Sequence, residues 1–125
     1  MEENDISFKI RGAIFNVYNQ LGPGLLESVY LMTLQYELNK IGLEVQREVP
    51  VPVYYDNNKL ELGFRLDLLV ENKVLIEIKS VETLAEVHHK QVLTYLKLTK
   101  LKLGILVNFN VDEINKGIFR KVNGL

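Results

Sequence analysis

The sequence predicts an α/β fold in which a mixed β-sheet has helices packed on its faces. Apolar residues recur at helical spacing in three segments, and strand-length segments that alternate or are continuously apolar lie between them. The expected order is helix, helix, three strands, helix, and one or two further strands, so one helix is a crossover within the sheet. With 125 residues, 47% of them apolar and 25% charged, we expect one domain over residues 1–125.

The N-terminal part supplies two helices. The first has either Asn4 or Asp5 as its expected cap, followed by five apolar residues at helical spacing: Ile6, Ile10, Ala13, Ile14 and Val17. Residues 21–24 (LGPG) end this helix because glycine and proline interrupt helical backbone. A second helix is expected from about residue 25 to residue 41, with Gly42 as its C-terminal stop.

Strands dominate the remainder. Residues 44–55 alternate but contain two prolines, which favours an edge or irregular strand, and residues 56–58 (DNN) predict a turn. Residues 59–70 and 74–80 are the next two expected strands. Thr83 and Glu86 have the spacing of a capping box, which predicts a helix from there to about residue 100. Residues 102–108 form an apolar strand, and residues 118–122 alternate weakly.

Composition and motifs exclude several classes. The absence of cysteine excludes disulfides and thiolate metal sites, and two adjacent histidines are too few for a zinc site. The acidic N-terminus and the lack of an apolar run of ~20 residues lead us to expect a cytoplasmic protein without a membrane span. A net charge of −1 is not typical of a protein that binds nucleic acid through a large excess of positive charge. The densest basic stretch consists of Lys97, Lys100 and Lys102, and is typical of a solvated helix end. The sequence has no P-loop, dinucleotide fingerprint or nucleophile elbow.

The strongest functional signal is an acid, a second acid and a lysine on two neighbouring strands. Charged residues are rare in such apolar strands unless they are paired or bind a metal, yet Asp67, Glu77 and Lys79 lie there. If residues 71–73 are a three-residue hairpin loop, the residue numbers of facing residues on the two strands add up to 144. Residue 70 then faces residue 74, and Asp67 faces Glu77. Lys79 then shares their face, whereas a two-residue loop would separate the acids. Two adjacent carboxylates suit Mg²⁺, and the alternative is an ion-pair cluster in which Lys79 bridges both acids without chemistry.

Polar residues on the helices add to this signal. Glu27 falls within the apolar stripe of the second helix, so it is either a third carboxylate aimed at the acid pair or a first-turn acid favoured by the helix dipole. Gln91 and Tyr95, four residues apart, interrupt the apolar stripe of the third helix. They either reach toward a substrate or lie at the rim of the helix contact, satisfied by backbone groups.

Residues 24–30 (GLLESVY) resemble the Gly-x-x-Glu-x-x-Tyr signature of the GxxExxY protein family, which belongs to the PD-(D/E)xK nuclease superfamily. The resemblance extends from about residue 6 to residue 122 and implies a restriction-endonuclease-like αβββαβ core. Asp67 matches the first acid of the motif, and Glu77 and Lys79 match its second half. Leu66 stands where the name of the motif has proline. Glu27 matches an acid on the preceding helix. Substrate contacts are expected from three residues of the matched motifs: Gln91, Tyr95 and Tyr30.

The resemblance implies a metal-dependent nuclease that hydrolyses phosphodiester bonds in nucleic acid, with DNA the expected substrate. Asp67, Glu77 and the Ile78 carbonyl are expected to hold Mg²⁺ or Mn²⁺, and Glu27 to hold a second metal or bind through water. Lys79 is expected to assist catalysis. A non-catalytic nucleic-acid- or protein-binding module on the same fold is the alternative. A homodimer that cuts two strands also stays open, with Tyr54 and Tyr55 as candidate interface residues.

Overall fold

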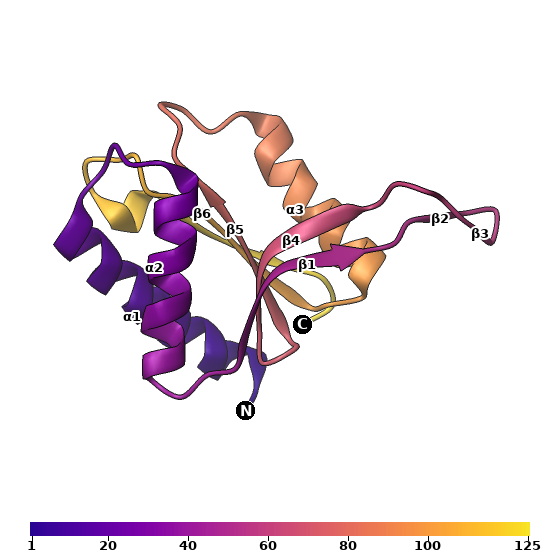
Figure 1. The fold of residues 1–125 in the computed structure, drawn as a ribbon, viewed down its shortest axis with the longest axis horizontal. Helices are drawn as coiled ribbons and strands as arrows, with labels where there is room; N and C mark the ends of the chain where they lie inside the picture. Colours follow the sequence, from indigo (N-terminus) through magenta and orange to yellow (C-terminus); the bar gives the residue numbers. More distant parts are fainter.

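The computed structural model describes all 125 residues. They form one five-stranded sheet, the helices that cover it, a projecting hairpin and the loops between these elements (Figure 1). In chain order the elements are α1 (Glu3–Leu21), α2 (Glu27–Lys40), β1 (Val45–Val51), β2 (Tyr54–Tyr55), β3 (Asn58–Lys59), β4 (Phe64–Val70), β5 (Val74–Lys79), α3 (Glu86–Thr99), β6 (Leu103–Asn108), the 3-10 helix η1 (Ile114–Lys116) and β7 (Ile118–Val122). The predicted α/β architecture is confirmed.

The strand order is β1-β4-β5-β6-β7, so β5 lies at the centre of the sheet. Only β5 and β6 are parallel, and α3 makes the crossover between them; the other neighbours are antiparallel. Helices α1 and α2 cover one face of the sheet and α3 covers the other (Figure 1). None of the helices has the length and apolar composition that a membrane crossing requires.

The two faces of the sheet pack into cores of unequal size. The larger core, 19 buried residues, joins α1 and α2 to inward-facing residues of β4, β5 and β6. The smaller core, beneath α3, has five members: Leu66, Leu75, Val92, Leu96 and Leu106. Because β5 and β6 are covered on both faces, a charged side chain on β5 is taken out of water.

Both predicted helix caps are wrong. Helix α1 begins at Glu3, and the Asn4 side chain instead accepts a hydrogen bond from Arg120 on β7. Helix α3 begins at Glu86, and the backbone N–H of Ala85 donates to Nδ1 of His88 at 3.0 Å, so Thr83 and Glu86 do not form a capping box. Local spacing identified a helix start in each case but could not tell which neighbouring group satisfies the free N–H groups.

The expected strand over residues 59–70 is also shorter than predicted. Only Phe64–Val70 joins the sheet, while residues 52–63 form an arm that leaves the body of the protein and carries the β2–β3 hairpin (Figure 1). Asp56 and Asn57 have φ of 50° and 64°, as the two central residues of a tight type I′ hairpin turn require. The predicted turn at residues 56–58 is therefore confirmed, with strand on both sides of it.

Candidate active site

The predicted register between β4 and β5 is correct. Leu68 pairs with Ile76 and Val70 with Val74, so the connecting loop has three residues. Beyond the Leu68–Ile76 pair the backbone hydrogen bonds between the two strands stop, and the side chains of Asp67 and Glu77 take their place. The backbone N–H of Asp67 donates to Oε2 of Glu77 at 2.9 Å, and the N–H of Ile78 donates to Oδ2 of Asp67 at 2.7 Å. The two carboxylates are thus fixed beside each other where the strands diverge.

The environment of this pair disfavours negative charge. Glu77 is only 4% exposed, and burial, followed by the charge of Asp67, raises its pKa to about 8. Burial likewise raises the pKa of Asp67. The backbone hydrogen bonds and the positive charge of Lys79 oppose both shifts without cancelling them. If both carboxyl groups were ionised, the pair would therefore carry more negative charge than its surroundings neutralise.

Lys79 lies at the end of β5, close enough for its charge to lower the pKa of both acids. It forms no ion pair with either of them, since the four ion pairs of the structure involve other residues. The interpretation of the three residues as an ion-pair cluster bridged by Lys79 is therefore not supported. Instead the ammonium group stays available beside two uncompensated carboxylates.

Glu27 occupies a different position from the expected one. It is the first residue of α2 and is exposed rather than buried within the apolar stripe. Its Oε2 accepts from the backbone N–H of Ser80 at 3.3 Å, while the Ser80 hydroxyl donates to the carbonyl of Leu25 at 2.6 Å. Its charge still raises the pKa of Asp67 and Glu77. Glu27 therefore lies near the acid pair, although no three carboxylate or histidine side chains are grouped closely enough to hold a metal by themselves.

The expectation that Tyr30 contacts substrate is wrong. The side chain is fully buried, and its ring stacks on Phe109 with centroids 4.3 Å apart. Its hydroxyl donates to the carbonyl of Gly22 at 2.6 Å and accepts from the N–H of Leu25 at 3.2 Å. Tyr30 fixes the loop before α2, and that loop in turn positions Glu27.

Gln91 and Tyr95 lie on the side of α3 that approaches the acids. The Tyr95 ring stacks on Phe64 of β4 at 4.1 Å, and its pKa is raised by burial and then by the charges of Glu77 and Asp67. Oε1 of Gln91 is the one buried side-chain polar atom without a hydrogen-bond partner. A buried acceptor without a partner is costly, so this amide is suited to receive a donor from a bound molecule or water.

Asp67 and Tyr95 line a cleft of about 470 Å³ together with Ser28, Leu31, Glu48, Phe64, Arg65 and Leu66. Two charged residues of this cleft, Glu48 and Arg65, were not predicted as site residues from the sequence. Glu48 lies opposite Asp67 on β1 and has a φ of 53°, and its charge adds to the raised pKa of Asp67. Arg65 pairs with Glu48 at 3.3 Å. The position of Arg65 two residues before Asp67 on one strand was the available sequence signal.

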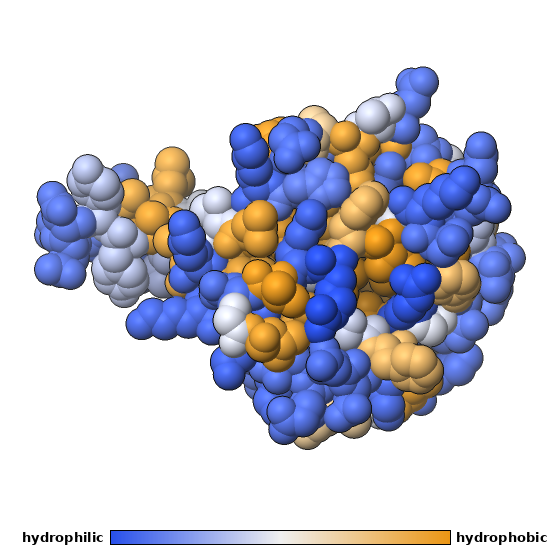
Figure 2. Space-filling view, turned by 180° about the vertical axis from the view of Figure 1, so that it is seen from behind, coloured by the Kyte–Doolittle hydropathy of each residue, from blue (hydrophilic) through white to orange (hydrophobic).

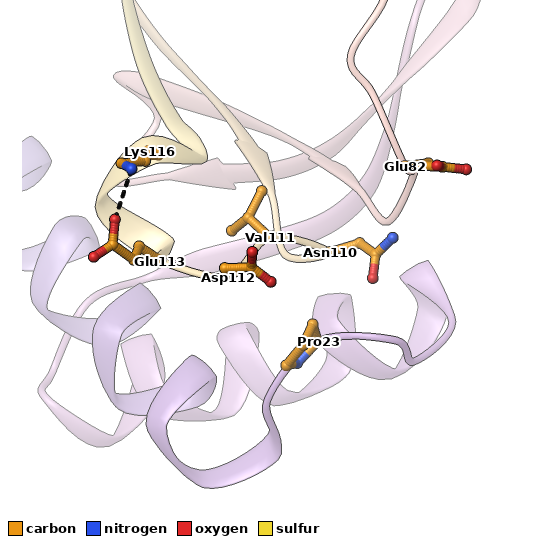
Figure 3. A pocket seen from close by; sticks show the side chains of 7 residues that line it. All are labelled: Pro23, Glu82, Asn110, Val111, Asp112, Glu113 and Lys116. Carbon is orange, nitrogen blue, oxygen red and sulfur yellow. Dashed lines mark ion pairs between the residues drawn. The ribbon is translucent and has the colours of Figure 1, made fainter.

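A larger hollow of about 750 Å³ lies elsewhere and includes none of the predicted site residues. Its walls come from three loops, shown in Figure 3: Pro23, Glu82 and residues 110–113, with Lys116 of η1 beside them. Glu113 pairs with Lys116 at 2.8 Å, and Glu82 stands well apart from the other two acids (Figure 3). This acidic surface has neither a buried charge nor a buried polar atom without a partner, so we place the candidate active site at the Asp67–Glu77 pair.

The residues of that site fit a divalent cation. Each carboxylate uses one oxygen to accept a backbone N–H, and Oδ1 of Asp67 and Oε1 of Glu77 make no hydrogen bond. Oxygen ligands with excess negative charge are those that Mg²⁺ and Mn²⁺ prefer. The raised pKa values of both acids agree with this. Burial makes their negative charge costly in the protein alone, and a bound cation would offset that cost.

Comparison with known protein families matches residues 4–121 to the PD-(D/E)XK nuclease superfamily. The chain therefore belongs to this superfamily, and the restriction-endonuclease-like fold expected from the sequence is confirmed. A solved structure entitled "Crystal structure of SSO0001" is similar, with 27% sequence identity and a TM-score of 0.57 over 79% of this chain. The match covers 51% of that chain, so this protein spans about half of its length. No match was found among curated protein sequences.

Proposed function

We propose that this protein is a metal-dependent nuclease that hydrolyses phosphodiester bonds in nucleic acid. The observation that carries the proposal is the Asp67–Glu77 pair, held by reciprocal backbone hydrogen bonds beside the unpaired Lys79. Membership of a nuclease superfamily gives this arrangement its chemical interpretation. DNA is the substrate we expect.

Asp67, Glu77 and the Ile78 carbonyl would hold Mg²⁺ or Mn²⁺, and Glu27 would act through a water molecule or at a second ion. Such an ion polarises the scissile phosphate and lowers the pKa of a bound water. The backbone bonds to Oδ2 of Asp67 and Oε2 of Glu77 keep both carboxylates in place while their other oxygens face the ligand. The contact between Glu27 and Ser80 keeps α2 against the end of β5, and therefore keeps the third carboxylate near the pair.

The remaining residues act on the substrate. Lys79 is a compact positive charge that orients the attacking water or stabilises the charge that develops on the phosphate. Tyr95 forms the α3 side of the cleft, and one turn before it on α3 the buried Oε1 of Gln91 lacks a partner and would accept a hydrogen bond from substrate or water. Arg65 offers a second cation in the same cleft.

Cleavage of a mixed pool of single-stranded, duplex and branched DNA and RNA in Mn²⁺ tests this function. Wild type is compared with Glu77→Gln, which keeps the size and one hydrogen-bond acceptor of the side chain. Glu37→Gln is the matched control, because Glu37 is also a buried glutamate, 7% exposed, but lies on α2 away from the cleft. We expect cleavage by wild type and Glu37→Gln and none by Glu77→Gln.

Equal cleavage by all three proteins would identify a contaminating nuclease. Absence of cleavage by all three would favour the non-catalytic binding module on the same fold. Either result contradicts the proposed activity, and cleavage by wild type names the substrate class directly.

A further inference from the structure

The arm, residues 52–63, presents aromatic and apolar side chains that nothing in the protein covers. Tyr54 is 60% exposed and Tyr55 is 72% exposed, and Leu60 and Leu62 are exposed beside them. The tight turn and a backbone bond from Leu60 N–H to the carbonyl of Val53 at 2.9 Å hold the arm in shape. Seen from behind, it stands clear of the body, with apolar and polar groups side by side (Figure 2).

The base of the arm is continuous with the cleft that holds Asp67. A hollow of about 480 Å³ runs along the arm, lined by Lys59, Leu60 and Glu61 and by residues 50–52 and 63–65. Phe64 and Arg65 line both this hollow and the cleft. A chain-like ligand bound at the acids can therefore continue past Phe64 and Arg65 onto the arm.

One tyrosine is placed to contact such a ligand. Tyr54 is the cross-strand partner of Lys59, and directly paired residues of an antiparallel ladder project from the same face. Lys59 lines the hollow, and Tyr54, which is not itself a lining residue, shares the face of the hairpin that carries Lys59. Tyr55 is the next residue of the strand and projects from the opposite face.

The charge along this path is small. Arg65 and Lys59 are its cations, with Glu48 and Glu61 close to them, and the whole chain has a net charge of −1. Duplex binding relies on many phosphate contacts, which these residues do not supply. Stacking of bases on aromatic rings gives affinity without such contacts, but it requires bases that are free of a duplex.

We propose that the arm and the adjoining hollow bind an unpaired nucleic-acid strand, with a base stacked on Tyr54 and phosphates beside Arg65 and Lys59. This inference rests on the proposed function, since it extends the substrate path from the Asp67–Glu77 site. It names the substrate class as single-stranded nucleic acid, or a single-stranded segment next to a duplex.

Fluorescence anisotropy of a labelled single-stranded oligonucleotide, and of the same sequence as a duplex, tests the proposal. EDTA is present, so binding is read without cleavage. We expect the single strand to bind more tightly, Tyr54→Ala to weaken its binding at least about fivefold, and Tyr54→Phe to restore it, because the ring supplies the stacking. Two neutralised phosphates predict a shallow salt dependence, with a slope of log K against log salt of about −1.4.

Two equally exposed tyrosines provide matched controls. Tyr36 is 65% exposed but lies on α2, and Tyr55 lies on the other face of the arm, so Tyr36→Ala and Tyr55→Ala should bind like wild type. Equal or tighter binding of the duplex, no binding at all, or an unchanged affinity of Tyr54→Ala would overturn the proposal. A concentration-dependent dimer in sedimentation velocity that Tyr54→Ala abolishes without changing oligonucleotide affinity would assign the arm to a second copy of the chain instead.

Binding and cleavage separate this inference from the nuclease activity. Tyr54-dependent binding without any cleavage by wild type would contradict the proposed nuclease and support the arm. Glu77-dependent cleavage together with binding that ignores Tyr54 would support the nuclease and overturn the arm.

Discussion

Without a bound cation, the Asp67–Glu77 pair should make the protein less stable as the pH rises, and Glu77→Gln should remove most of that loss. The protonated form of Glu77 is favoured in the folded protein, where its pKa is raised to about 8 by burial and by Asp67, against an ordinary value of 4.5. Between these values the folded state binds more protons than the unfolded state, so the free energy of unfolding falls with pH. Below pH 4.5 the group is protonated in both states, and above pH 8 it is ionised in both, so the change is confined to that window.

The difference between the two pKa values sets the magnitude. At 1.36 kcal/mol for each pH unit, it corresponds to a loss of about 4 to 5 kcal/mol across the window for an isolated site. Asp67 shares the charge and titrates with Glu77, so about 4 to 5 kcal/mol is the upper limit of the loss attributable to Glu77. That is a large part of the 5–15 kcal/mol that stabilises a typical domain.

Urea denaturation in EDTA at pH 5, 6, 7, 8 and 9 measures this effect. Plotting the difference in unfolding free energy between Glu77→Gln and wild type removes the contribution of titrating groups that do not interact with Glu77, and leaves that of Glu77 and its coupling to Asp67. We expect the difference to grow with pH in favour of the glutamine variant and to level off above pH 8. A difference that stays constant from pH 5 to pH 9 would refute the argument that burial of this carboxylate is uncompensated.

Three further outcomes follow from the same geometry. Lys79→Ala should lose at least ~10²-fold in cleavage rate, measured in Mn²⁺ beside Lys73→Ala in the β4–β5 loop, and an unchanged rate would remove Lys79 from the mechanism. Mn²⁺ at 100 times its Kd should stabilise wild type by about 2.7 kcal/mol and so raise its melting temperature, whereas the melting temperature of Asp67→Asn should not change. Equal shifts in both proteins would place the ion elsewhere. Tyr30→Phe should lower the unfolding free energy by about 1 kcal/mol, because the Gly22 carbonyl and the Leu25 N–H lose the tyrosine hydroxyl as their hydrogen-bond partner; urea titration would show no change if these bonds contribute nothing.

The acid pair could be predicted from the sequence because it depends on local quantities. The length of the turn and the alternation of a strand determine that residue 67 meets residue 77, and the structure has the three-residue loop that this requires. The apolar residues around Glu77 indicated burial, and burial is the main cause of its raised pKa. Order and type of the main helices and strands were predictable for the same reason, since periodicity reflects which face is covered.

Positions that depend on distant segments could not be predicted. Glu27 falls within an apolar stripe by helical spacing, yet it is exposed at the first residue of α2, while Tyr30, three residues later on the same stripe, is fully buried. Tyr30 is buried because Phe109, 79 residues later in the chain, supplies the surface on which its ring stacks. The arm replaces an expected continuous strand, and at its end Gly63 passes so close to β1 that a Cβ atom there would lie 2.2 Å from the Val51 carbonyl oxygen. None of these contacts is encoded in neighbouring residues.

Three structural features that cost stability lie at or near the Asp67–Glu77 pair. Glu77 is a buried acid with a raised pKa, Gln91 has a buried oxygen without a partner, and Glu48 adopts a positive φ opposite Asp67. Each is unfavourable in the protein alone, since buried polar groups need partners and a non-glycine residue rarely adopts positive φ. Because a cation would offset the charge and a bound water or substrate would satisfy the amide, two of these costs would be relieved by the same occupancy of the site. This shared relief distinguishes a binding site from unrelated local defects.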